Sequence, residues 1–276
     1  MSTRIIILGD IVGTPGRQAV NQIIPQLKEK FNPHLIIANA ENAANGTGLT
    51  PELYRKICNY GVDAITLGDH VYKKQLITKT LEQENNIIRP ANLSKKAIGK
   101  TLMKLIIPPT PTTPSKNIYI FTLLGRVFMN HLPASCPFQC ADEILAQIPD
   151  KNPIIIAEIH AETTSEKQAI GWYLNGRVSA VFGTHTHVQT NDPRILNKGT
   201  AYITDLGMCG PQESILGRDI KRVLKHMTTN MPAPFDVAQE DPRLCGIYLE
   251  ISDDTQKAIH IETLQIKANT KQAPWC

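Results

Sequence analysis

Two histidines, two residues apart, follow an apolar run in the second half of the sequence. His185 and His187 come shortly after an apolar segment that ends at Gly183. In an extended backbone, side chains at positions i and i+2 point to the same face, so both imidazoles can converge on one site. If that site holds two metal ions about 3.5–4 Å apart, each histidine can bind one of them. Alone, such a pair is more often two polar loop residues, so it needs support from the rest of the chain.

Residues that can bind metal ions also follow three apolar runs in the N-terminal part of the sequence. They are Asp10 after residues 5–8, Glu41 and Asn42 after residues 34–39, and Asp69 and His70 after residues 64–67. The spacing of about 30 residues is typical of β-α units, in which ligands bind at the carboxyl ends of the strands. One such residue is readily explained as a helix cap or a turn former. Three successive strand ends of this kind favour a common site.

His160 ends a further apolar run, residues 153–159, and completes the set of candidates. The set comprises Asp10, Glu41, Asn42, Asp69, His70, His160, His185 and His187. Mixed carboxylate, amide and imidazole donors suit manganese, iron or zinc, whereas sites made only of oxygen favour magnesium or calcium. A set with at least seven ligand candidates is too large for one ion and suits two ions that share a bridging carboxylate. Two such ions generate a hydroxide at neutral pH and hold both oxygens of an in-line displacement at phosphorus, which predicts phosphoester hydrolysis.

These residues need an α/β arrangement to bring them together. We expect strands at residues 5–8, 34–39, 64–67, 102–107, 117–124, 153–159, 178–182, 201–204, 244–251 and 257–266. We expect a first helix from residues 14–15, kinked or ended early by Pro25, and further helices at residues 51–60, 76–84, 142–148 and 165–174. The proline-rich stretch 108–116 joins two strands as an exposed hairpin tip, and the paired strands around it indicate a second, more antiparallel sheet.

The bulk composition is that of an ordinary globular protein of 276 residues. No apolar run approaches the ~20 residues of a membrane helix, and the N-terminus lacks the apolar region of a signal peptide. Six cysteines without a C-x-x-C pair agree with the cytoplasmic protein that we therefore expect. The formal charge of +4 comes from scattered basic residues, which argues against sequence-specific nucleic-acid binding and suits a small anionic substrate. No linker divides residues 1–276, so we expect one domain, and whether it forms a homo-oligomer stays open.

Seven longer motifs occur in a fixed order along the chain. They are G-D-I-V-G-T-P-G-R, N-A-E-N-A-A-N-G-T-G, T-L-G-D-H, R-P-A-N, H-A-E-T-T-S-E-K, G-T-H-T-H-V-Q-T-N-D and A-Y-I-T-D-L-G-M-C-G-P. From Ile5 to about Met231, the chain thereby resembles the YmdB-type branch of the calcineurin-like metallophosphoesterases. The resemblance implies a four-layer α/β/β/α sandwich with two mixed sheets flanked by helices. It also implies a di-metal centre with iron or manganese, and hydrolysis of cyclic nucleotides, with 2',3'-cyclic nucleotides favoured, by a metal-bridging hydroxide.

The same resemblance assigns a role to each candidate residue. It makes Asp10, Asn42 and His187 ligands of one ion, Asp69, His160 and His185 ligands of the other, and Glu41 the bridge between them. His70 is placed near the phosphate, as the catalytic group that stabilises the transition state or protonates the departing oxygen.

Two positions depart from the family's pattern. Asp69 stands where relatives carry asparagine, and Lys73 stands where they often carry aspartate. The extra carboxylate takes the formal charge of two divalent ions and their carboxylates from about +2 to +1. Metals should then bind more tightly, the bridging water should be less acidic and an anionic substrate should be held less strongly. We hypothesise that Asp69→Asn raises turnover at neutral pH, and that Lys73 partly restores the field if this segment enters a helix. Alternatively, Asp69 is merely another oxygen donor, with little effect.

Three functions are compatible with the sequence. The leading one is a di-metal phosphodiesterase that acts on a small phosphodiester or a cyclic nucleotide. The alternative is a metal-binding regulatory protein of the same fold whose phosphodiesterase activity is weak or lost, as the change at Asp69 permits. A third is a dinucleotide-binding α/β protein built on Gly9, Gly13 and Gly16, but their spacing is not G-x-G-x-x-G and this function leaves the histidines unexplained.

Overall fold

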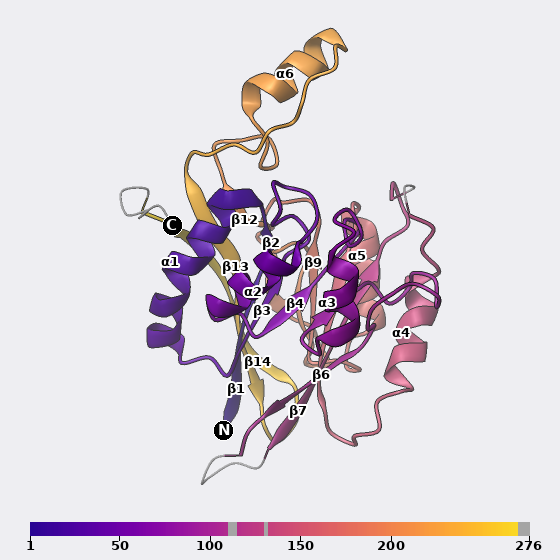
Figure 1. Cartoon of the computed structure of the whole chain (residues 1–276). Coiled ribbons are helices and arrows are strands. Elements are labelled where there is room, and N and C mark those ends of the chain that lie inside the picture. The colour runs from indigo at the N-terminus through magenta and orange to yellow at the C-terminus, as the bar shows by residue number, and fades with distance from the viewer. Residues whose placement is uncertain (110–114, 130–131, 270–276) are drawn as a thin grey trace.

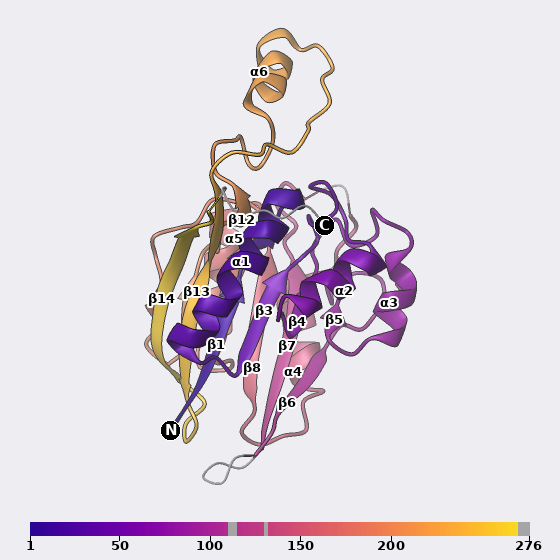
Figure 2. The same cartoon turned by 60° about the vertical axis from the view of Figure 1, so that its left-hand side comes forward.

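Two β-sheets pack face to face with helices on both outer sides, which confirms the four-layer α/β/β/α arrangement (Figure 1, Figure 2). The computed structural model describes residues 1–109, 115–129 and 132–269. The first sheet has eight strands in the order β2-β12-β13-β1-β3-β4-β5, with β14 beside β13. The second has six strands in the order β10-β11-β9-β8-β7-β6. Both sheets mix parallel and antiparallel pairs.

The strands are those expected, with four short additions at β2, β5, β10 and β12. Their bounds are β1 Ser2–Leu8, β2 Asp10–Ile11, β3 Leu35–Asn39, β4 Ala64–Thr66, β5 Ile87–Ile88, β6 Met103–Ile107, β7 Lys116–Leu124, β8 Ile154–His160, β9 Ala180–Thr184, β10 Arg194–Ile195, β11 Ala201–Ile203, β12 Met208–Pro211, β13 Pro242–Ser252 and β14 Ala258–Lys267. The helices are α1 Gly13–Phe31, α2 Pro51–Asn59, α3 Ile77–Gln83, α4 Pro137–Leu145, α5 Thr164–Tyr173 and α6 Ile220–Thr229.

Three apolar layers hold the sheets and helices together, because successive side chains of a strand point to opposite faces. In β1, Ile6 and Leu8 pack in the layer that also contains the buried face of α1. Ile5 and Ile7 pack on the other face, against the inner side of the second sheet. A third layer joins the outer side of the second sheet to the buried residues of α4 and α5. Strands that are apolar on both faces are the reason that the sequence shows continuous rather than alternating apolar runs.

Several boundaries differ from the expected ones. The first helix does not end at Pro25 but continues to Phe31. The fourth begins at Pro137 and ends at Leu145, not at residues 142–148, because a proline is favourable at the first position of a helix. The segment after Asp69 forms turns and becomes helical only at Ile77, so the helical spacing proposed between Asp69 and Lys73 is wrong. The hairpin of β6 and β7 is confirmed, but residues 110–114 at its tip lie outside the described residues.

An arm of residues 212–241 projects away from the two sheets and was not predicted (Figure 1, Figure 2). It contains α6, which Asp219 caps by accepting a hydrogen bond from the Arg222 backbone N–H. The sequence of α6 is amphipathic, yet Leu224 and Met227 on its apolar side are exposed. Helix α6 contacts residues of the arm itself, where Arg222 pairs with Asp236 and the His226 ring packs against Phe235. In the part of the chain that the structure describes, no helix has the length and apolar character needed to cross a bilayer.

Candidate functional site

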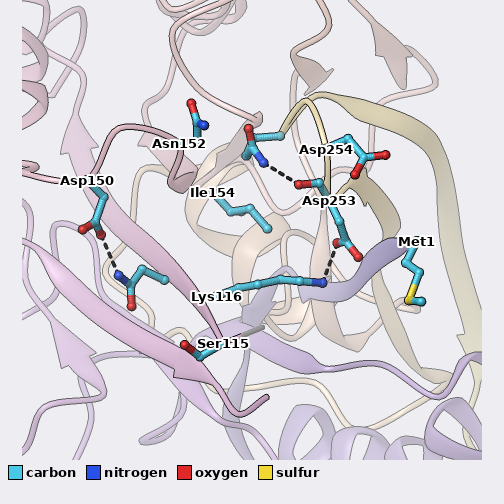
Figure 3. Close-up of a pocket in the computed structure, with 10 residues that line it drawn as sticks. Met1, Ser115, Lys116, Asp150, Asn152, Ile154, Asp253 and Asp254 are labelled. Carbon is cyan, nitrogen blue, oxygen red and sulfur yellow. Dashed lines mark hydrogen bonds and ion pairs between the residues drawn. The ribbon is translucent and has the colours of Figure 1, made fainter. Parts of the chain in front are cut away.

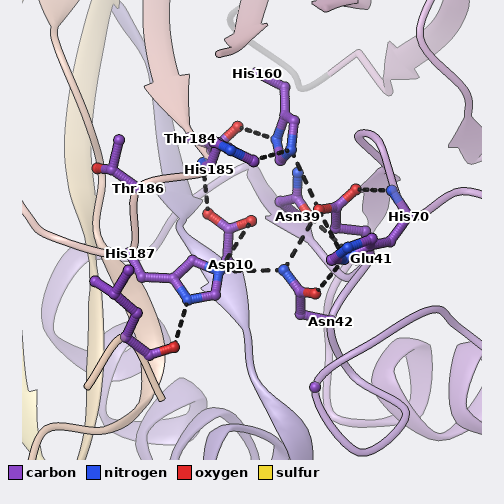
Figure 4. A network of polar contacts seen from close by, with 12 residues as sticks. Asp10, Asn39, Glu41, Asn42, His70, His160, Thr184, His185, Thr186 and His187 are labelled. Carbon is purple, nitrogen blue, oxygen red and sulfur yellow. Dashed lines mark hydrogen bonds and ion pairs between the residues drawn. The ribbon is translucent and has the colours of Figure 1, made fainter. Parts of the chain in front are cut away.

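The structure brings all eight candidate residues together at the carboxyl ends of five strands, and Figure 4 labels all of them except Asp69. Asp10 follows β1 and opens β2, Glu41 and Asn42 follow β3, Asp69 and His70 follow β4, His160 ends β8, and His185 and His187 follow β9. Strands β3 and β4 belong to the first sheet and β8 and β9 to the second. The site is therefore built where the two sheets face each other, and neither sheet supplies it alone.

Four of these residues converge on one point. Glu41, Asp69, His160 and His185 each offer a ligand atom, and these atoms all lie within 4.8 Å of one another. His160 Nε2 is 2.8 Å from Asp69 Oδ1 and 3.2 Å from Glu41 Oε1. His185 Nδ1 is 3.1 Å from His160 Nε2. Two carboxylates and two imidazoles arranged in this way form a suitable site for a divalent cation.

Three further residues lie beside this group and form a second one. Asn42 Nδ2 is 3.2 Å from His187 Nε2, and His187 Nε2 is 3.9 Å from Asp10 Oδ1. Asp10 is fully buried, and its Oδ1 has no hydrogen-bond partner among the described residues. A buried carboxylate oxygen without a donor is costly unless a cation lies against it. The amide of Asn42 would present Oδ1 instead of Nδ2 to His187 after a half-turn.

The three histidines expected to bind metal ions each have an acceptor beside their outer ring nitrogen. His187 Nδ1 donates to the Leu216 carbonyl at 3.0 Å, and His185 Nε2 faces Glu162 Oε2 at 3.1 Å. His160 Nδ1 lies 2.9 Å from the hydroxyl of Thr184, whose own hydrogen is donated to Glu158. Because each of these partners accepts, the outer nitrogen carries the proton. When a cation binds, the inner nitrogen would give up its proton and turn a lone pair toward the cation, as a metal ligand must.

The electrostatics of the site favour positive charge. Burial alone would lower the pKa of His160, but Glu41 and Asp69 outweigh it and raise the pKa well above its usual value. Burial opposes ionisation of Asp69, yet hydrogen bonds to His160 and His185 hold the pKa of Asp69 well below its usual range. Burial raises the pKa of Asp10; His187 and His160 oppose the rise, and the charges of Glu41 and Asp205 add to it. A proton on His160 thus balances part of the negative charge of Glu41 and Asp69, which a bound cation would otherwise balance. The donor set therefore fits divalent metal ions.

His70 has the most exposed side chain among the histidine candidates, 27% against 21% for His185 and 14% for His187. The Nδ1 atom of His70 lies 2.8 Å from Asn42 Oδ1, and its Nε2 lies 3.6 Å from Asp69 Oδ2. The backbone N–H of His70 donates to Glu41 Oε2 at 2.9 Å. His70 therefore borders both groups of ligands and remains accessible to a substrate. Gly68 permits this packing, since a Cβ at that position would collide with the His160 ring and the Glu41 carboxylate.

The expected extended backbone at His185 and His187 is wrong. Strand β9 ends at Thr184, and both histidines have positive φ, 96° for His185 and 64° for His187. Residues other than glycine rarely adopt this left-handed backbone conformation, so the surrounding structure must stabilise the turn at residues 185–187. The two imidazoles converge because the chain turns sharply on each side of Thr186.

A buried ion pair holds this turn, and sequence reasoning missed it. Lys167 Nζ in α5 lies 2.6 Å from Asp205 Oδ2, and both side chains are almost fully buried. The same oxygen accepts hydrogen bonds from the backbone N–H and the hydroxyl of Thr186, at 3.2 and 2.8 Å. Asp205 Oδ1 accepts from the backbone N–H of Gly207. The carboxylate thus fixes the residue between the two histidines, and Lys167 neutralises it.

The base of the arm contacts the site at two places. Its Leu216 carbonyl accepts from His187, as described above. Arg218 donates to two carbonyls and a hydroxyl within residues 45–47, the loop that follows Asn42. One contact is made to His187 and the other to the loop that follows Asn42. The arm therefore supports the half of the site that contains the second group of ligands.

Comparisons with known proteins agree with this geometry. The sequence model of the family described as YmdB-like protein matches residues 6–264. The 2',3'-cyclic-nucleotide 2'-phosphodiesterase of Bacillus subtilis (strain 168) is 45% identical over 95% of this chain and 97% of that protein. The crystal structure of a novel phosphatase from Mycoplasma pneumoniae superposes with a TM-score of 0.89 at 33% identity, covering 97% of this chain and 94% of that one. A 5'-nucleotidase from Candida albicans shares the fold, with a TM-score of 0.55 at 12% identity over 97% of this chain and 51% of that one.

We expect Lys167→Met to destabilise the protein by about 3–5 kcal/mol, because it leaves the Asp205 carboxylate buried and unpaired. Urea unfolding followed by circular dichroism measures the change. Lys95→Met is the control, since Lys95 is exposed and its pair with Glu143 should contribute at most about 1 kcal/mol. The double variant Lys167→Met/Asp205→Asn should recover part of the loss, because an amide oxygen still accepts from Thr186. Equal stability of the Lys167 and Lys95 variants would contradict the role of this pair.

Proposed function

The chain belongs to the YmdB-like protein family, and on this basis we propose that it is a metal-dependent phosphodiesterase that hydrolyses 2',3'-cyclic nucleotides. The observation that carries the proposal is the convergence of Glu41, Asp69, His160 and His185 on one point. The identity of 45% to the Bacillus subtilis 2',3'-cyclic-nucleotide 2'-phosphodiesterase supports the choice of substrate.

Seven residues would hold two divalent ions. Asp10, Asn42 and His187 would bind one ion, Asp69, His160 and His185 the other, and Glu41 would bridge them. Glu41 is suited to this position because its Oε1 lies 3.4 Å from Asn42 Nδ2 and 3.2 Å from His160 Nε2, one residue from each group. Imidazole among the donors favours iron or manganese over magnesium or calcium.

The chemistry requires an activated water and a proton donor. Two divalent ions bound here would supply the Lewis acidity that activates water at neutral pH and offsets charge at phosphorus. His70 would supply the proton, because its ring borders both groups of ligands and is accessible to a substrate. As water adds to phosphorus and the bond from phosphorus to O2' breaks, His70 would protonate O2', giving a nucleoside 3'-phosphate.

The whole chain would act as one metallophosphoesterase domain in the cytoplasm. Both sheets contribute ligands, so neither could hold the two ions without the other. The five cysteines among the described residues are unpaired, which suits a reducing compartment.

Purified protein loaded with Mn²⁺ should hydrolyse 2',3'-cyclic AMP, and EDTA should abolish the activity until Mn²⁺ is restored. His187→Ala should lower kcat/KM by at least about 100-fold, because it removes a ligand as well as the contact with Asn42. Chromatography of the products measures turnover and should show adenosine 3'-phosphate. His226→Ala is the matched control, since His226 is exposed on α6 and contacts Met231 and Phe235 of the arm rather than any candidate ligand. Activity that survives both chelation and loss of His187 would refute the proposal.

A regulatory protein with weak activity is the second candidate, and the carboxylate of Asp69 favours it. Asp69 adds a third negative charge to Asp10 and Glu41, all three of which are buried. We expect Asp69→Asn to raise kcat for 2',3'-cyclic AMP at pH 7 by roughly 3- to 10-fold, because less negative charge makes the activated water more acidic. Asp254→Asn changes the net charge equally at an exposed turn and should have no effect. An unchanged or lower rate for Asp69→Asn would mean that Asp69 serves simply as an oxygen donor.

A further inference from the structure

A cavity of about 410 Å³ shares His187 with the metal-ligand cluster. It lies between the loop that follows β9, the ends of β12 and β13, strand β14 and the base of the arm. Its volume is within the range of small-molecule sites in proteins, about 300–1,000 Å³. The cavity thus adjoins the place where a phosphate would react, and it is large enough for another part of the same substrate.

The walls of this cavity are apolar on both sides of His187. Val188 follows His187 in the chain and is 58% exposed, while Leu216 holds His187 through its carbonyl and is 51% exposed. Met208 and Ile215 also line the cavity. Exposed aliphatic side chains near a predicted metal ligand are suited to contact a flat, weakly polar ring.

The polar groups of the cavity besides His187 are uncharged and include amides. Gln212 and Gln265 line it, and the Nε2 of Gln212 has only long contacts, 3.4 and 3.5 Å to backbone carbonyls and 4.0 Å to the Cys245 sulfur, so it is able to turn to a ligand. Gln189 is different, because its Nε2 donates to three carbonyls at 3.1–3.2 Å and is committed to the fold. A primary amide offers one donor and one acceptor, which matches the hydrogen-bonding edge of a nucleobase.

The absence of charge in this cavity excludes a second anion site. Among the described residues, no lysine, arginine, aspartate or glutamate lines it. A larger hollow of about 600 Å³ is the opposite case, since Lys116, Asp150, Asp253 and Asp254 line it and it contains none of the candidate ligands (Figure 3). Its three carboxylates would repel a phosphate-bearing ligand.

We propose that the cavity beside His187 is the nucleobase site of the enzyme. The proposal rests on the proposed function, because it places the cyclic phosphate among the metal ligands and the base behind His187. One edge of the His187 ring faces Asp10 and Asn42, and Val188 and Leu216 line the same cavity as His187. The base would lie between Val188 and Leu216, and Gln212 and Gln265 would contact its edge.

The test is calorimetric binding of adenosine 3'-phosphate and of inorganic phosphate to the full-length protein loaded with Mn²⁺. Wild-type protein should bind the nucleotide at least 10-fold more tightly than phosphate. Val188→Ser should weaken nucleotide binding about 5- to 10-fold and leave phosphate binding unchanged, because the serine removes only the apolar contact with the base. Leu216→Asn is a second variant that keeps the carbonyl and suits the positive φ of 51° at this position. It should act in the same direction.

Val127→Ser is the matched control, since Val127 is 45% exposed on another loop and does not line the cavity. It should bind both ligands as wild type does. The proposal is overturned if adenosine 3'-phosphate binds no more tightly than phosphate, or if Val188→Ser weakens both ligands equally. Hydrolysis of bis(4-nitrophenyl) phosphate and of 2',3'-cyclic AMP separates the two proposals. Selective nucleotide binding without any turnover would contradict the proposed function and support the nucleobase site. Turnover without selective nucleotide binding would support the proposed function and contradict the nucleobase site.

Discussion

A hydrogen bond between the two sheets is the interaction on which the site depends. Asn39 at the end of β3 donates to Glu158 in β8 at 2.7 Å, and Glu158 is fully buried. On the side of the first sheet, Asn39 Oδ1 accepts from the backbone N–H of Glu41. On the side of the second sheet, the Thr184 hydroxyl donates to Glu158 and faces His160 Nδ1. One buried carboxylate therefore sets the positions of two candidate ligands from different sheets.

Burial raises the pKa of Glu158, and Thr184 and Asn39 oppose that rise by donating hydrogen bonds to the carboxylate. A buried polar network destabilises the fold when some of its groups lack hydrogen-bond partners, and it fixes one arrangement when all of them are satisfied. This network therefore specifies how the two sheets align. The ion pair between Lys167 of α5 and Asp205 acts in the same way, because Asp205 holds the turn that contains His185 and His187. Rigid support of this kind is what a metal site needs in order to keep its ligands in place before the metal binds.

Much of the fold and of the candidate cluster could be predicted because both follow from local patterns. Apolar runs at β-α spacing placed Glu41, Asp69 and His160 at strand ends, and the structure brings those strand ends together. The backbone of the two histidines could not be predicted, because its left-handed turns depend on Asp205, which follows in the chain, and on a lysine of α5. The arm escaped prediction for a related reason. Its helix has an amphipathic sequence, but no apolar run in the sequence shows where the chain leaves the two sheets and the arm begins.

The most direct measurement is anomalous X-ray scattering from crystals of the full chain grown with Mn²⁺, recorded at the manganese absorption edge. We expect two anomalous peaks, one surrounded by Glu41, Asp69, His160 and His185 and the other beside Asp10, Asn42 and His187. No peak among these residues, in crystals whose manganese lies only at the protein surface, would contradict the di-metal site.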